Sequence, residues 1–192
     1  MPKLSIALLL LFTCTQLFGQ LSKTPLNEAS FSTQLNKVVL DFPANFNSLQ
    51  GNRMPAEVDA DTYLSTVCFP GALVCKVMRY RSVQDKSASW QALLYEGDSF
   101  EEAVKLYRKM HALVRKTLIK GTDGFSAGFE GKFENIDENV GFAVSTLRLN
   151  TKNSRYRSLV AELNINSSYT GWEVKLDLYT RSLMEEENTN GQ

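Results

Sequence analysis

The segment from Ser99 to Gly121, SFEEAVKLYRKMHALVRKTLIKG, is the strongest structural constraint in the chain. Its apolar residues recur every three or four positions, as along one face of an α-helix; they are Phe100, Ala103, Tyr107, Met110, Val114 and Leu118. Ser99 and Glu102 have the spacing of a capping box at the helix start, and Gly121 predicts its end. A helix with one apolar face has to bury that face against another element.

Much of the remaining chain is typical of β-strands. We predict strands over residues 63–81 (around a Pro70-Gly71 turn), 89–96, 140–149, 156–165 and 172–180. The last of these alternates apolar and polar residues, which predicts one buried and one wet face. In residues 121–139, Phe129, Gly131 and Phe133 alternate with charges and predict an edge strand, joined to residue 140 onward by an IDEN turn. The alternative interpretation is a lid that carries phenylalanines over a pocket.

A second helix precedes the strands. Apolar residues from Phe31 to Leu49 recur at helical spacing, and Pro43 ends the regular helix near Asp41. We therefore predict a single α+β domain over residues 31–183, in the order α-β-β-α-β-β-β-β. Two helices would pack on one face of an antiparallel sheet of about six strands.

The N-terminus has the layout of a secretory signal peptide. Lys3 is followed by the apolar run from Leu4 to Phe12 and then by small or polar residues, which predicts a leader over residues 1–19. The run is too short for a transmembrane anchor. A lipoprotein would use Cys14, but its neighbours Phe12 and Thr13 disfavour that interpretation. Residues 20–30 are predicted to be a flexible entry, and residues 184–192 an acidic, disordered tail.

Two cysteines remain after removal of the leader, and they flank the Pro-Gly pair in VCFPGALVC. An exported protein, periplasmic or extracellular, would pair Cys68 with Cys75 in a structural disulfide. A tight hairpin would place them diagonally, so the bond requires a bulge or a longer loop. Two buried free thiols are the alternative.

Several classes of chemistry find no support in the residues. The chain has 21 basic and 21 acidic residues, which argues against a nucleic-acid partner. His111 is the only histidine, it borders the apolar stripe of its helix, and no nucleophile motif accompanies it. The carboxylate runs lack the spacing of a calcium loop. We therefore predict no catalytic residue, no cofactor and no metal.

The prediction for function is an exported, non-enzymatic binding or interaction domain with an unknown protein partner. Its surface would be the sheet face away from the helices, on which Tyr179, Lys175, Trp90 or Tyr80 would lie. One alternative is a carrier of a small apolar ligand between helix and sheet, with Phe125 and Phe129 near the mouth. A second alternative is a hydrolase with an unrecognised site.

Overall fold

The computed structural model describes residues 27–55, 59–81, 87–122 and 124–181. The predicted leader over residues 1–19, including Cys14, and the predicted tail over residues 184–192 lie outside these ranges. So does most of the predicted flexible entry.

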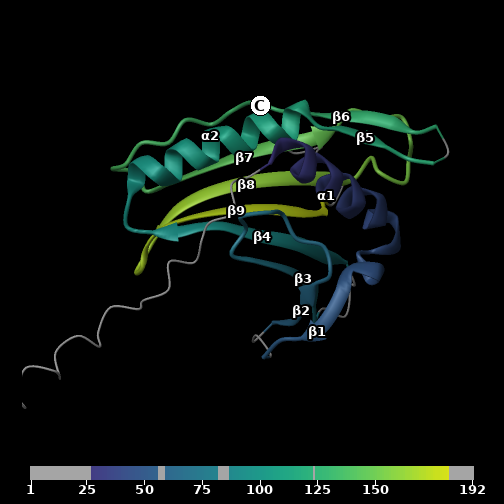
Figure 1. Ribbon diagram of the computed structural model, residues 1–192, viewed down its shortest axis with the longest axis horizontal. Coiled ribbons are helices and arrows are strands. Elements are labelled where there is room, and N and C mark those ends of the chain that lie inside the picture. Colours follow the sequence, from purple (N-terminus) through teal and green to yellow (C-terminus); the bar gives the residue numbers. More distant parts are fainter. Residues whose placement is uncertain (1–26, 56–58, 82–86, 123, 182–192) are drawn as a thin grey trace, which may run out of the picture.

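Two α-helices pack on a large antiparallel sheet (Figure 1), so the fold class is α+β, as predicted. Among the described residues the elements are α1 (Glu28–Asp41), β1 (Gln50–Arg53), β2 (Ala60–Ser65), β3 (Val74–Tyr80), β4 (Ala88–Gly97), α2 (Phe100–Lys116), β5 (Leu118–Lys120), β6 (Ser126–Glu130), β7 (Phe142–Leu149), β8 (Leu159–Ser168) and β9 (Gly171–Thr180). The strand order across the sheet is β1-β2-β3-β4-β9-β8-β7-β6-β5. Two meanders, β1–β4 and β5–β9, therefore meet where β4 pairs with β9.

The sheet in the described residues has nine strands, so the prediction of about six was wrong. The segment 63–81, counted as one strand, is a hairpin of β2 and β3. Residues 50–53, for which no strand was predicted, form β1, which pairs with β2 as an edge strand. The third strand that was not predicted is β5, which lies in the segment predicted to form the last turn of the helix.

Helix α2 ends at Lys116, earlier than the predicted stop at Gly121. Thr117 is the C-cap with an extended ψ of 124°, and β5 follows at once and pairs with β6. Ile119 is fully buried whereas Leu118 is 52% exposed, so the prediction that Leu118 belongs to the buried helical stripe was wrong. A spacing of four residues from Val114 fits a helix, but pairing with β6 determines the backbone of this segment.

Helix α1 begins three residues before the predicted domain boundary. The Asn27 side chain accepts a hydrogen bond from the backbone N–H of Ala29 at 2.9 Å and so caps the helix inside the predicted flexible entry. The helix ends at Asp41, as expected from Pro43. Phe42, Phe46 and Leu49 continue the buried stripe through two short 3₁₀ turns, Phe42–Ala44 and Asn47–Leu49.

The aromatic part of the core joins α1 to the sheet. Phe69 lies between Phe31 of α1 and Trp90 of β4, with ring centroids 4.5 Å and 5.0 Å apart. Trp90 is fully buried, which corrects its predicted place on the face away from the helices. The register explains this position, because Trp90 pairs with Val77 and Leu178, which are both fully buried.

The disulfide between Cys68 and Cys75 closes the loop that carries Phe69, with the two Cα atoms 5.3 Å apart. Pro70 and Gly71 form the predicted turn: Gly71 has a φ of 83°, and Ala72 N–H donates to the carbonyl of Phe69. Cys68 lies outside the strand ladder, because β2 ends at Ser65 and β3 begins at Val74. The longer loop that the spacing required is therefore present.

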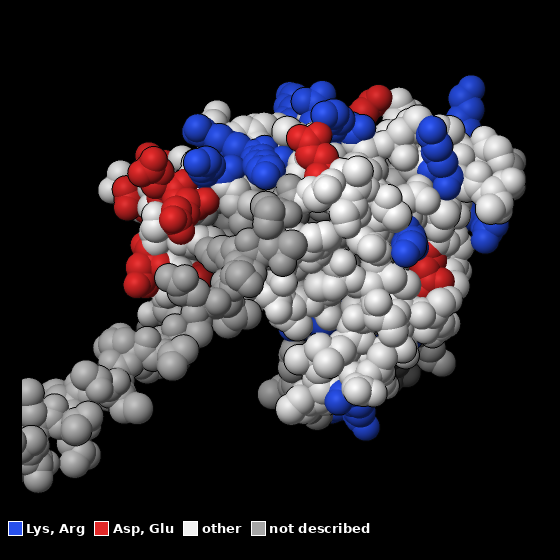
Figure 2. Space-filling view, viewed as in Figure 1, with Lys and Arg blue, Asp and Glu red and all other residues white. Residues whose placement is uncertain are grey.

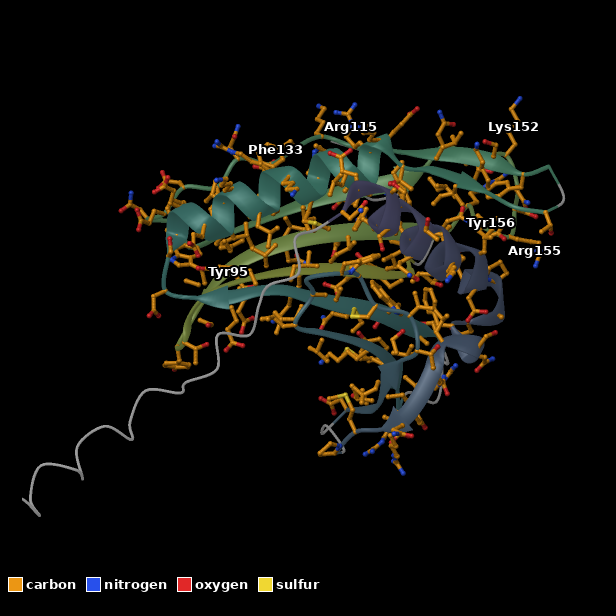
Figure 3. The ribbon with its side chains drawn as sticks, in the orientation of Figure 1. Tyr95, Arg115, Phe133, Lys152, Arg155 and Tyr156 are labelled. Atoms are coloured by element: carbon orange, nitrogen blue, oxygen red, sulfur yellow. A yellow bond between two sulfur atoms is a disulfide. The ribbon has the colours of Figure 1, made fainter. Side chains whose placement is uncertain are left out.

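The segment after β6 leaves the sheet and follows α2 (Figure 3). A Cβ atom on Gly131 would lie 2.2 Å from the carbonyl oxygen of Thr146, so only glycine allows this close crossing of β7. Phe133 packs on Tyr107 and His111, with ring centroids 5.1 Å from each. The predicted strand thus spans residues 126–130 instead of 129–133, and it is not at the sheet edge because β5 covers it.

Candidate functional site

The side chains of β9 separate the two faces of the sheet. Trp172, Val174, Leu176 and Leu178 are buried on the side of the helices, and Glu173, Lys175, Asp177 and Tyr179 point to the opposite side. We call the side away from α1 and α2 the outer face. As predicted from alternation, Tyr179 and Lys175 belong to it.

A hollow of about 360 Å³ opens on the outer face over β4, β8 and β9. The lining residues come from strands that are far apart in sequence; they are Tyr80, Ser87, Ser89, Gln91, Glu162, Asp177, Tyr179 and Thr180. We call it the outer hollow. Its walls combine two aromatic rings with carboxylate, amide and hydroxyl groups.

Asp177 forms the floor of the outer hollow. Gln91 Nε2 donates to its Oδ1 at 2.6 Å, and Asn164 Nδ2 donates to its Oδ2 at 2.9 Å, so each carboxylate oxygen is held by a neighbouring strand. Burial raises the pKa of Asp177 above its ordinary value, and the charge of Glu162 raises it further, whereas the two amide donors oppose the shift.

Glu162 lies directly opposite Asp177 in the pairing of β8 with β9. The Tyr179 hydroxyl hydrogen-bonds to Glu162, and burial together with this contact raises the pKa of Tyr179 far above its ordinary value. On the other wall, the Tyr80 hydroxyl lies 3.4 Å from Ser89 Oγ. Each tyrosine hydroxyl therefore contacts another residue that lines the hollow.

The raised pKa of Asp177 predicts a pH dependence of stability. The folded state holds this proton more tightly than the unfolded chain, so Asp177 makes the free energy of unfolding fall as the pH rises from about 3.8 through the folded pKa. Asp177→Asn removes the titration. Urea unfolding of both proteins between pH 4 and pH 8 should show that the wild type loses stability relative to the variant as pH rises. A constant or rising difference would contradict this assignment.

A second hollow, of about 570 Å³, lies between the C-terminal half of α2 and β6; it is lined by His111, Ala112, Arg115, Lys116, Gly128, Phe129 and Glu130. Two of its charges have partners within the protein: Lys116 pairs with Glu28 at 2.8 Å, and Glu130 accepts from Asn150. Burial lowers the pKa of His111, whose ring packs against Phe133. Two of the three lysine, arginine and glutamate side chains that line this hollow are therefore engaged within the protein.

Charge on the side of the helices follows the dipole of α2 (Figure 2). Glu101 and Glu102 occupy its first turn, and Arg115 and Lys116 occupy its last. Figure 2 shows acidic groups gathered at the left of the view and basic groups along the top. Arg115 is directed outward from α2 in Figure 3.

The two predicted mouth residues are packed. Phe129 is 2% exposed within the core, and Phe125 stacks on Tyr156 with ring centroids 4.6 Å apart and planes 9° apart. Phe129 also contributes to the wall of the second hollow.

Sequence reasoning missed Asp177, Glu162 and Gln91. Alternation places Asp177 on the wet face of its strand, but nothing in the sequence pairs it with Glu162 and Gln91. That depends on the register of β4, β9 and β8.

Comparisons of the chain with protein-family models, with curated proteins and with solved structures found no match. Within the described ranges, no cluster of three or more His, Cys, Asp or Glu side chains could hold a metal ion. Nor does either helix there have the length and apolar character needed to cross a membrane.

Proposed function

We propose that the protein is an exported, non-enzymatic binding domain, and that its ligand is a small polar molecule held in the outer hollow. The observation that carries the proposal is Asp177, a carboxylate fixed by two amide donors at the floor of a hollow. Ligand sites commonly combine such concave walls with a few converging polar groups and a residue of perturbed pKa.

The energetics of the floor support this proposal. Burial of a carboxylate costs free energy that hydrogen bonds recover only in part. Glu162 directly opposite Asp177 adds repulsion, because like charges in cross-strand pairs are destabilising. Apolar residues at these positions would avoid both costs, so the arrangement is better explained by a ligand than by stability.

The carrier of an apolar ligand is less well supported. It needs an apolar space between α2 and the sheet with Phe125 and Phe129 at its mouth, and both side chains are packed against protein. The hydrolase alternative is also less well supported, because it needs a nucleophile, or an acid and a base, beside His111. The carboxylate that lines the same hollow as His111 is Glu130, and it already accepts a hydrogen bond from Asn150.

Export is supported by the leader-like N-terminus and by the disulfide, since such bonds persist in oxidising compartments. Mass spectrometry of the protein from its own cells tests this part. A chain that begins at Gln20 supports export, and an intact N-terminus in the cytoplasm contradicts it.

Binding is tested with Tyr80→Ala, which removes one wall of the outer hollow. A panel of neutral sugars, amino acids, carboxylates and amines is titrated into the full chain and followed by two-dimensional NMR. At least one compound should shift the side-chain amide signals of Gln91 and Asn164, and Tyr80→Ala should weaken its binding by about tenfold, in the range of one lost aromatic contact.

The matched control is Tyr169→Ala. Tyr169 is a fully exposed tyrosine in the turn between β8 and β9, and it does not line the outer hollow. Its removal should leave the affinity unchanged. If no compound in the panel shifts the Gln91 and Asn164 signals, or if both variants weaken binding equally, the proposed site is wrong.

A further inference from the structure

Two carboxylates, Glu162 and Asp177, line the outer hollow. Glu162 and Asp177 face each other across two strands, and no lysine or arginine is among the described residues that line the hollow. Both carboxylates have donors already, from Tyr179 to Glu162 and from two amides to Asp177. These donors are neutral, so the negative charge of the pair is not balanced by its immediate partners.

Three basic residues at neighbouring positions do not line the hollow. Lys175, at the outward position of β9 that precedes Asp177, is paired with Glu173. Lys76 lies opposite Gln91 in the pairing of β3 with β4, and Arg181 acts on Tyr179 from just beyond the end of β9. A ligand that carries a positive charge would therefore supply what the lining residues do not.

We infer that the ligand of the outer hollow carries an organic ammonium group. Its N–H groups would donate to the carboxylates of Glu162 and Asp177, whose oxygens can each accept more than one hydrogen bond. Tyr80 and Tyr179 line the same hollow, and aromatic rings attract cations through their π-faces. This inference rests on the proposed function, and it adds the chemical class of the ligand.

Two alternatives explain the lining residues less well. A neutral sugar would use the tyrosines and amides, but it would leave the repulsion between the two carboxylates in place. A metal ion would need more ligands, since no described cluster of three or more metal-binding side chains exists here. An ammonium group both relieves the repulsion and needs only the two carboxylates.

Binding of a cation is linked to the protonation of Asp177. A positive ligand favours the ionised carboxylate, so binding at acidic pH releases a proton, and affinity falls as pH falls through the raised pKa of Asp177. The groups that face Asp177 are Glu162, Gln91, Asn164 and, more weakly, Lys175.

The test compares n-butylammonium chloride with 1-butanol, its neutral counterpart of nearly equal size, and with methyl α-glucoside. Each probe is titrated into the full chain at pH 7 and followed through the side-chain amide signals of Gln91 and Asn164. We expect butylammonium to shift both signals and the two neutral probes to leave them unchanged. Asp177→Asn should weaken butylammonium binding by at least about tenfold, as loss of a charge-assisted bond predicts.

The control variant is Glu96→Gln, which removes an exposed carboxylate on β4 that bonds to Thr170 and does not line the hollow. Its affinity should match that of the wild type at equal ionic strength. A wild-type affinity that falls between pH 7 and pH 4 would add support, provided that the fold is intact by circular dichroism at both values.

The outcomes separate this inference from the proposed function. If methyl α-glucoside shifts the Gln91 and Asn164 signals and butylammonium does not, the hollow binds ligands but the ammonium inference is wrong. The inference is also overturned if butylammonium and 1-butanol bind equally, or if Glu96→Gln weakens binding as much as Asp177→Asn. Absence of any response to butylammonium rejects it too, and the wider panel then decides the proposed function.

Discussion

The Trp90→Ala variant should lose about 3–5 kcal/mol of unfolding free energy, the range for removal of a large buried aromatic side chain. Trp90 is fully buried, its ring packs on Phe69, and its Nε1 donates to Ser65 Oγ at 2.9 Å. The substitution would leave a cavity where α1, the disulfide loop and the sheet meet. Urea unfolding followed by circular dichroism measures the loss.

The control for this variant is Tyr169→Ala, an aromatic deletion at a fully exposed turn position, which should change stability by less than about 0.5 kcal/mol. A loss below about 1 kcal/mol for Trp90→Ala would show that Trp90 is not at the centre of the core.

Removal of the disulfide should cost about 2.5 kcal/mol. The loop between Cys68 and Cys75 spans a sequence separation of 7, and the chain-entropy model gives this cost for so short a loop. The double variant Cys68→Ser, Cys75→Ser should therefore unfold at lower urea concentration. Because the loop also holds Phe69 between Phe31 and Trp90, loosening it should weaken the same part of the core.

Reduction of the wild type is the matching control, and it should lower stability to about the level of the double variant. Alkylation of both thiols in untreated protein, without a reductant, would contradict the bond. A stability loss on addition of reductant to the double variant would show that the reagent acts elsewhere.

The sequence predicted the fold class because local patterns determine it. Alternation along β9, the Ser99 cap of α2 and the Pro70-Gly71 turn each depend on near neighbours, and each is present in the structure. The errors in the predicted helices and strands occurred where pairing between strands overrides the preference of the local sequence. Leu118 continues the helical spacing of α2, yet it lies in a strand because its backbone pairs with β6. The polar residues of β1 form a strand because they pair with β2.

The outer hollow depends on information of the same distant kind. Tyr179 and Lys175 could be assigned to the outer face from alternation alone. Trp90 was misplaced because β4 is buried on both faces at its start: Ala88, Ser89 and Trp90 are all buried, so burial along the strand does not show which side faces the helices. Asp177 became a candidate only when the register brought Gln91, Asn164 and Glu162 around it.

The position of β9 has a consequence for how the molecule reaches its native state. The ribosome releases the N-terminal part of a chain first. Among the described residues, however, β9 is the last strand in sequence, and it lies in the middle of the sheet, between β4 and β8. Until residues 171–180 emerge, the two meanders have no common border. A nascent chain without these residues would lack the central strand of the sheet, so we expect cooperative folding to await the synthesis of residues 171–180.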